Sequence, residues 1–179
     1  MQLDMDSQAR LYCLIPRIEI EAAVNRLAAE IAADYRDKKP LLIGILKGSF
    51  IFLADLVRHL DFPLEIEFVR LSSYGNSRET SGNVAVVQGL ESSIEGRDVI
   101  VVEDIVDTGL TIAFFIDYLK KKAPASLKLC ALTDKSSRRQ VPVEIDYLGF
   151  SVPDKFLVGY GLDYDEQFRY LPDICFLEE

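Results

Sequence analysis

Three carboxylates and several small hydroxyl residues lie close together in the stretch VIVVEDIVDTGLT, residues 99–111. Its first four residues are apolar, as in a buried strand, and a helical pattern follows it. A turn from a strand into a helix presents unpaired backbone N–H groups at the positive end of the helix dipole, which favours an anion. We therefore expect the turn to hold one phosphate monoester. The groups concerned belong to Thr108, Gly109, Leu110 and Thr111.

A simpler interpretation is that Asp107 or Thr108 only caps the helix. Glu103 and Asp104 argue against it, because they lie at the end of the apolar strand and have no capping role there. Two carboxylates beside an anion site suit the vicinal hydroxyls of a ribose, a magnesium ion, or both, since acceptors must pair with donors or cations. A phosphate site next to a diol site describes a ribose 5-phosphate.

The spacing of apolar residues predicts the elements that must position these groups. Helices are expected at residues 18–35, 49–60 and 110–122, with Ser49 as the N-cap of the second. Strands are expected at residues 41–46, 65–73, 84–88, 99–102, 126–134 and 143–150. This alternation predicts one α/β domain, residues 1–179, with a mostly parallel twisted sheet and helices on both faces. Ligands of such sheets bind beyond the carboxyl ends of the strands, where Lys47 and Gly48 also lie.

The composition excludes several classes of partner. The chain has 29 Asp and Glu against 20 Lys and Arg, which argues against nucleic acid or an anionic membrane. The first residues are acidic where a secretory signal is basic, and no stretch has the length of a membrane span, so we expect a cytoplasmic protein. The three separated cysteines predict reduced thiols. The only histidine, His59, is expected on a helix surface and leaves no Cys/His metal cluster to propose.

The stretch at residues 99–111 resembles the phosphoribosyl pyrophosphate-binding signature of the type I phosphoribosyltransferases, in which two acids follow an apolar strand and precede Asp-Thr-Gly-x-Thr. Four other segments are similar to bacterial hypoxanthine-guanine phosphoribosyltransferases. They are ILKGS (pyrophosphate loop), SSYGNSRETSG (lid), LTDK (purine-contacting strand end) and DKFLVGYGLDYDEQFR (terminal segment). The resemblance implies a mobile lid at residues 72–83 and a small base-binding hood formed by residues about 1–16 and 146–179.

The resemblance also implies a reaction in purine salvage. N9 of hypoxanthine or guanine would displace pyrophosphate from C1 of phosphoribosyl pyrophosphate, giving IMP or GMP, and xanthine is a further candidate base. Mg²⁺ is the implied cofactor, and a homodimer or homotetramer is the implied assembly. The apolar face of the helix at residues 18–35 and the region at residues 56–62 are candidates for contact between copies.

Roles at the sugar and pyrophosphate follow from the same resemblance. Lys47 and Gly48 would meet the pyrophosphate, and Arg169 would supply it with a second cation. The peptide before Lys47 can be cis in this family. The acids would hold the ribose hydroxyls or Mg²⁺, and the implied metal ligands are Glu103, Asp104 and Asp163.

Roles at the base are implied in the same way. Asp107 would face N7 of the purine as a general base, and Phe156 would stack on the ring. Lys135 would donate to O6 and so select 6-oxopurines over adenine, while the backbone of Leu157 would contact the N1 side. The implied catalytic residues are Asp107, Lys135, Arg169, Ser73 and Tyr74, the last two at the start of the lid. Ile105 joins the substrate-binding set.

Two other functions compete with this interpretation. A non-catalytic sensor of phosphoribosyl pyrophosphate would share the fold but lack Asp107, the lid, or Asp163 and Arg169, and would often carry a basic surface. A magnesium-dependent phosphoryl-transfer or receiver domain would place acids at the ends of several strands and would not need the Thr-Gly-x-Thr turn. This chain keeps all the catalytic parts and is acidic, which favours the enzyme.

Overall fold

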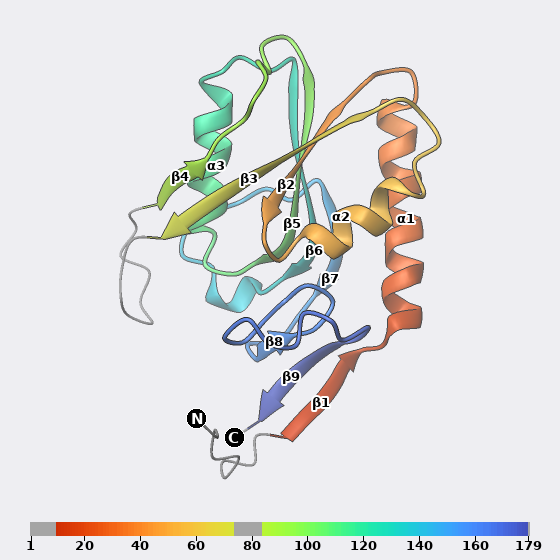
Figure 1. Cartoon of the computed structure of the whole chain (residues 1–179), viewed down its shortest axis with the longest axis vertical. Helices are drawn as coiled ribbons and strands as arrows, with labels where there is room; N and C mark the ends of the chain where they lie inside the picture. Colours follow the sequence, from red (N-terminus) through yellow and green to blue (C-terminus); the bar gives the residue numbers. More distant parts are fainter. Residues whose placement is uncertain (1–9, 74–83, 179) are drawn as a thin grey trace.

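A six-stranded sheet forms the centre of the computed structural model, which describes residues 10–73 and 84–178. The strand order is β4-β3-β2-β5-β6-β7, and only β4 is antiparallel to its neighbour (Figure 1). The strands are β2 (Leu41–Leu46), β3 (Glu65–Ser73), β4 (Val84–Gln88), β5 (Asp98–Val106), β6 (Ser126–Asp134) and β7 (Tyr147–Ser151). The carboxyl ends of the parallel strands therefore share one edge.

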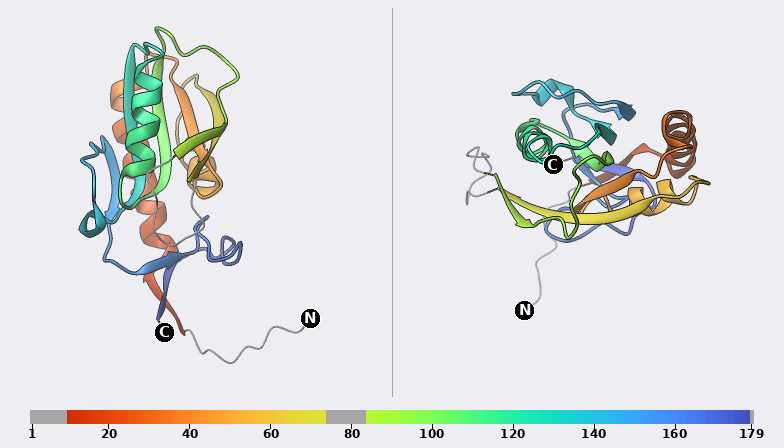
Figure 2. Two further views of the ribbon diagram at one scale, coloured as in Figure 1. Left: turned by 90° about the vertical axis from the view of Figure 1, so that its left-hand side faces the viewer. Right: turned by 90° about the horizontal axis from the view of Figure 1, so that it is seen from above.

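Helices cover both faces of this sheet (Figure 2). On one face lie α1 (Arg17–Tyr35) and α2 (Phe50–Val57), and on the other lies α3 (Leu110–Lys120). Side chains alternate along a strand, so Leu42 of β2 packs into the core under α1 and α2 while Leu41 and Ile43 pack under α3. Burial on both faces explains why β2 is apolar throughout. The predicted α/β class with a mostly parallel sheet is confirmed.

The two ends of the described chain meet in a second, three-stranded antiparallel sheet (Figure 1). Its order is β1 (Arg10–Ile15), β9 (Ile174–Glu178) and β8 (Phe156–Val158). This small sheet lies below the carboxyl edge of the large one in the view of Figure 1. Its role as a base-binding hood stays a prediction, and residues 1–9 of the predicted hood lie outside the described part of the chain.

Four of the six predicted strands, β2, β3, β4 and β6, have the expected bounds. The prediction for β5 was too short, because pairing with β6 continues from Asp98 to Val106. Glu103 and Asp104 therefore lie inside the strand and not after it. Ser49 is the N-cap residue of α2, as expected, but its side chain does not cap the helix, since its Oγ donates to the carbonyl oxygen of Ile45 at 2.7 Å. Ser73 ends β3, while the rest of the lid, Tyr74 included, lies outside the described residues.

Two surface expectations also need correction. The apolar face of α1 and the side chains of Leu56, Leu60 and Phe62 are buried in the core, so they cannot serve as contacts between copies. His59 is exposed but follows the end of α2 instead of lying within it. Within the described residues the three cysteines are free, and no helix is long and apolar enough to cross a membrane.

Two isoleucines on α1 provide a test of this packing. Ile31 is fully buried, whereas Ile18 on the same helix is 69% exposed. We expect Ile31→Ala to lower the free energy of unfolding by about 2 to 5 kcal/mol, because it leaves a cavity in the core. Ile18→Ala should change it by less than about 0.5 kcal/mol. Urea denaturation measures both, and equal losses would contradict the burial of this face.

Candidate active site

The loop after β2 and the acidic part of β5 are in direct contact at the carboxyl edge. A Cβ added to Gly48 would lie 1.7 Å from Oδ2 of Asp104, so only glycine lets the backbone pass this carboxylate. Gly161 packs on the opposite side of the same loop, because a Cβ added there would lie 2.2 Å from the carbonyl oxygen of Gly48. Its φ of +101° also requires glycine. Segments far apart in the sequence thus meet backbone to backbone.

The turn between β5 and α3 has the geometry of an anion site. Gly109 is the N-cap of α3 with a φ of 84°, and no side chain forms a capping hydrogen bond there. Thr108 Oγ1 accepts only a long bond of 3.4 Å from the amide of Leu110. The first-turn N–H groups are therefore open to a ligand. A cavity of about 130 Å³ adjoins the turn, and its walls include Glu103, Ile105, Asp107, Thr108, Gly109 and Thr111.

A neighbouring loop holds this turn in place. The amides of Gln140 and Val141 both donate to the carbonyl oxygen of Thr108, at 2.9 and 3.3 Å. A Cβ on Gly109 would lie 2.9 Å from the carbonyl oxygen of Val141 and 3.0 Å from Cδ of Arg139. Arg139 is itself ion-paired with Asp134 at the end of β6. The turn is thus fixed from outside before any ligand binds.

Asp104 is buried and Glu103 is half-buried, and neither forms an ion pair with a basic side chain among the described residues. Burial raises the pKa of Asp104 to about 6, although the backbone N–H of Ile105 donates to it and Arg169 lies near enough to oppose the rise. Burial, followed by repulsion from Asp104, raises the pKa of Glu103 well above its usual range. Oε2 of Glu103 has no hydrogen-bond partner among the described residues. Such groups suit a ligand that brings donors or positive charge.

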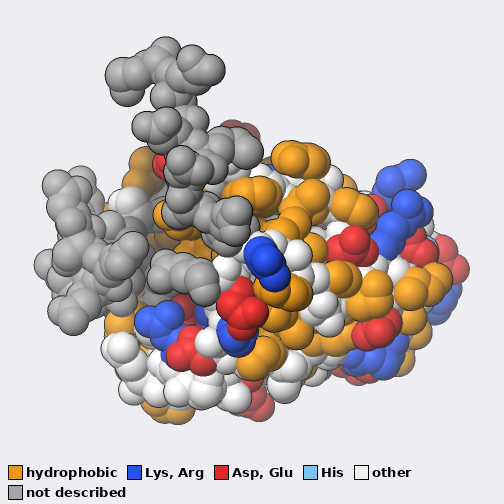
Figure 3. All heavy atoms as spheres, turned by 90° about the horizontal axis from the view of Figure 1, so that it is seen from below, with side chains coloured by type: hydrophobic (Ala, Val, Ile, Leu, Met, Phe, Trp, Pro, Cys, Tyr) orange, Lys and Arg blue, Asp and Glu red, His pale blue; other side chains and the backbone are white. Residues whose placement is uncertain are grey.

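Two basic side chains, those of Lys47 and Arg169, belong to the loops that meet at Gly48 and Gly161. Arg169 Nη2 is 2.7 Å from Oδ1 of Asp163, and its Nη1 donates to the carbonyl oxygen of Gly161 at 2.7 Å. Lys47 follows a cis peptide bond and its Nζ is 2.8 Å from Oε1 of Glu166. Both cations therefore border the loop that contains Gly48. Seen from below the sheet, acidic and basic side chains adjoin in the middle of this face, among hydrophobic ones (Figure 3).

The described residues contain no group of three His, Cys, Asp or Glu side chains placed to hold a metal ion. Mg²⁺ does not need such a cage, because it usually binds one or two carboxylates and takes its other ligands from water and substrate phosphates. Glu103 and Asp104 fit this mode, since both are acceptors in need of positive charge. Asp163 is engaged with Arg169 in this structure.

Comparison with known proteins agrees with this geometry. Residues 17–165 match the family model described as the phosphoribosyl transferase domain. The hypoxanthine-guanine phosphoribosyltransferase of Bacillus subtilis (strain 168) is 46% identical over 165 residues, which cover 92% of each chain. That of Aquifex aeolicus (strain VF5) is 46% identical over 171 residues, 95% of this chain and 96% of its own. The chain belongs to the hypoxanthine-guanine phosphoribosyltransferase family.

A crystal structure from the same family has the same fold. The hypoxanthine-guanine phosphoribosyltransferase from Bacillus anthracis superposes with a TM-score of 0.89 at 42% identity, over 94% of this chain and 99% of its own. Membership in this family makes the chain a transferase of phosphoribosyl groups. The resemblance inferred from the motifs is confirmed.

The side chains expected to contact the base have mixed surroundings. Lys135 directly follows β6, is only 5% exposed, and its amide donates to the carbonyl oxygen of Val106 at 2.9 Å. Phe156 is 52% exposed, and its ring packs edge-on against the ring of Tyr164 with 5.4 Å between the ring centroids. Leu157 belongs to β8, an edge strand whose outer backbone groups can bond a ligand. Asp107 Oδ1 lies 3.6 Å from Nε of Arg138 and has no hydrogen bond among the described residues.

Several contacting residues were not predicted from the sequence. Arg138 beside Asp107 and Arg139 behind the phosphate turn follow the LTDK segment, and only the run of two arginines could have drawn attention to them. Glu166 lies within the recognised terminal segment, but its partner Lys47 is 119 positions away. Contacts between residues so far apart in the chain cannot be predicted from the sequence around either residue.

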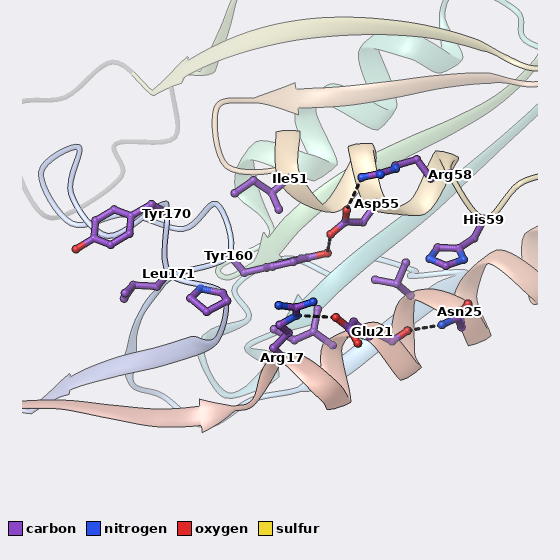
Figure 4. Close-up of a pocket in the computed structure, with 13 residues that line it drawn as sticks. Arg17, Glu21, Asn25, Ile51, Asp55, Arg58, His59, Tyr160, Tyr170 and Leu171 are labelled. Atoms are coloured by element: carbon purple, nitrogen blue, oxygen red, sulfur yellow. Dashed lines mark hydrogen bonds and ion pairs between the residues drawn. The ribbon is translucent and has the colours of Figure 1, made fainter.

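A cavity larger than the one at the turn lies away from the predicted site. It has a volume of about 610 Å³ and lies between α1, α2 and the loop around residues 160–172 (Figure 4). Tyr160 forms part of its wall, and its hydroxyl donates to Oδ2 of Asp55 on α2 at 2.7 Å. This bond anchors the loop that carries Gly161 and Arg169 to the helix that follows Gly48.

Replacing Asp104 with asparagine tests the buried charge. A pKa raised from 3.8 to about 6 corresponds to about 3 kcal/mol of stability lost once the group is ionised. Because the folded pKa is the higher one, the contribution of Asp104 to the free energy of unfolding is fully present below the unfolded pKa of 3.8, where the acid is neutral. That contribution is lost as the pH rises through about 6 and the acid ionises. We therefore expect Asp104→Asn to exceed the parent in unfolding free energy by up to about 3 kcal/mol near pH 8, and by little near pH 4.

The control for this measurement is Asp117→Asn, because that side chain is 72% exposed on α3. Its effect on the unfolding free energy should not vary in this way with pH. A gain for Asp104→Asn of the same size at both pH values would contradict the raised pKa.

Proposed function

We propose that this chain catalyses magnesium-dependent transfer of the phosphoribosyl group of phosphoribosyl pyrophosphate to N9 of hypoxanthine or guanine, giving IMP or GMP and pyrophosphate. The observation that carries the proposal is the uncapped turn at Gly109 beside the half-buried Glu103 and the buried Asp104. An anion site and a site for diol or cation adjoin there, as a ribose 5-phosphate requires. The printed names of the relatives support the choice of bases.

The sugar and pyrophosphate sites follow from charge. In the reaction the bond from C1 to the pyrophosphate oxygen breaks and a bond from C1 to N9 forms, so positive charge develops on the ribose and negative charge on the leaving group. Glu103 and Asp104 would face the first, and Lys47 and Arg169 the second. The first turn of α3 would hold the 5-phosphate. These positions are fixed in advance, which is what electrostatic stabilisation needs.

The base would lie against the ends of β5, β6 and β8. Asp107 would take the proton that the purine loses, Lys135 would donate to O6, and Phe156 would cover one face of the ring. The backbone of Leu157 would contact the N1 side. We also propose that residues 72–83, from Ser73 and Tyr74 onward, close over the site and exclude water, which would otherwise hydrolyse the activated sugar.

Glu103, Asp104 and Asp163 would hold Mg²⁺ together with the substrate. The ion would supply positive charge to the pyrophosphate and ribose oxygens. Asp163 would first have to release Arg169, with which it is paired here. Xanthine as a third base and the choice between dimer and tetramer are also proposals, which kinetics with the three bases and sedimentation velocity respectively would test.

The central experiment is a measurement of IMP and GMP formation from phosphoribosyl pyrophosphate, Mg²⁺ and each base. Product that depends on all three components supports the proposal. Binding of phosphoribosyl pyrophosphate without turnover would instead favour the sensor. The presence of Asp107, Asp163 and Arg169 argues against the sensor.

Asp107→Asn separates chemistry from binding. We expect turnover to fall by about 100-fold or more, the range attributed to a positioned base, with little change in affinity for phosphoribosyl pyrophosphate. Asp154→Asn is the matched control, because Asp154 also lies near Arg138, at 3.9 Å, but is not a predicted site residue. Steady-state kinetics and calorimetry measure the two effects. Unchanged turnover would remove Asp107 from the mechanism.

Lys135→Ala tests the choice of base. The buried ammonium suits O6 of hypoxanthine and is left without an acceptor by the amino group of adenine, so its removal should narrow the preference for hypoxanthine by about tenfold or more. Lys120→Ala, at the exposed end of α3, should leave the preference unchanged. The ratio of kcat/KM values for the two bases gives the result. A ratio that does not move would refute the O6 contact.

A further inference from the structure

The carboxylate of Glu166 forms ion pairs with both basic side chains of the proposed pyrophosphate site. Oε1 of Glu166 is 2.8 Å from Nζ of Lys47, and Oε2 of Glu166 is 3.4 Å from Nη2 of Arg169. The two ion pairs therefore bridge across the place where the leaving group would bind. A bound pyrophosphate would need the same ammonium and guanidinium groups that Glu166 holds.

The backbone around Glu166 has an unusual conformation that holds its side chain between Lys47 and Arg169. Asp165, Glu166 and Phe168 have φ values of 51°, 61° and 72°, in the left-handed region that residues other than glycine seldom adopt. A two-way backbone pairing between Tyr164 and Gln167 closes the turn, with N–O distances of 3.2 and 3.0 Å. The amide of Glu166 also donates to Oδ2 of Asp163 at 2.8 Å. Unusual conformations of this kind persist only where the surroundings impose them, and they gather at functional sites.

We propose that Glu166 is an internal competitor of pyrophosphate, which neutralises Lys47 and Arg169 when the site is empty and gives them up when the anion binds. Glu166 would thereby lower the affinity for pyrophosphate and ease its release after the reaction. The inference rests on the proposed function, because it takes Lys47 and Arg169 as the pyrophosphate cations. It assigns Glu166 no contact with substrate and no part in the chemical step.

The size of the effect follows from exposure. The side chains of Lys47 and Glu166 are 48% and 63% exposed, so water screens this pair. Arg169 is 20% exposed and keeps a second acid, Asp163, at 2.7 Å when Glu166 leaves. Exposed pairs are individually weak, which limits the combined effect of two of them to about two- to tenfold in affinity. This is enough to tune release without blocking binding.

Glu166→Gln tests the proposal, because glutamine keeps the shape of the side chain and removes its charge. We expect calorimetry of the whole protein with inorganic pyrophosphate and Mg²⁺ to give a dissociation constant about two- to tenfold lower than the parent's. Glu166→Asn provides a second variant, since asparagine tolerates left-handed φ values. Glu178→Gln is the control, because Glu178 forms a comparable pair with Lys155 at 3.2 Å and is 50% exposed.

Lys47→Ala and Arg169→Lys separate this inference from the proposed function. If these two variants weaken pyrophosphate binding while Glu166→Gln leaves it unchanged or weakens it, Glu166 is not a competitor and the inference fails. If Lys47→Ala and Arg169→Lys leave binding unchanged, the proposed pyrophosphate site is itself wrong. Tighter binding in Glu166→Gln and Glu166→Asn but not in Glu178→Gln, with the same far-UV circular dichroism as the parent, supports the inference.

Discussion

The site depends on two carboxylates inside a central strand of a mostly parallel sheet, where Asp104 is buried and Glu103 is half-buried. Burial alone makes ionised acids costly, and neither Glu103 nor Asp104 is in contact with a cation among the described residues. The stability of the surrounding sheet, which is packed on both faces and paired along both sides of β5, offsets this cost. A ligand that brings hydroxyl donors and a metal ion would relieve this cost. Raised pKa values with a specific charged neighbour are typical of functional sites.

The other groups of the site are arranged around these acids by close contacts of the main chain. Asp104 touches the backbone of Gly48, Gly48 touches Gly161, and the carbonyl oxygen of Gly161 accepts a bond from Arg169. The first two contacts each join segments more than fifty positions apart in the chain, whereas the third joins residues within one loop. Each link has a main-chain atom on at least one side, so a displacement of Asp104 would be transmitted through Gly48 and Gly161 to Arg169. Asp104 and Arg169 are therefore mechanically coupled.

The sequence allowed the fold and the centre of the site to be predicted because both have local signals. Apolar runs fixed the bounds of β2 and β6, and the acidic turn after β5 has a motif of its own. What could not be predicted depends on partners distant in the chain. The length of β5 is set by pairing with β6. The hydroxyl of Ser49 donates to the carbonyl oxygen of Ile45, and Glu166 pairs with Lys47, which is 119 positions away in the chain.

The contact between Gly48 and Gly161 involves no side chain, and this restricts which substitutions the chain can accept at these two positions. At most positions a larger residue can be accommodated by a neighbour that shrinks. Here the neighbour of Gly161 is a main-chain carbonyl oxygen, which no substitution can make smaller, and the neighbour of Gly48 is the carboxylate of Asp104, which could be made smaller only by losing that acid. A second substitution therefore cannot make room for a larger residue at Gly161, and at Gly48 it would remove the carboxylate of Asp104. Variation in this part of the molecule should instead gather in residues whose side chains face solvent, such as Tyr170, which is 80% exposed.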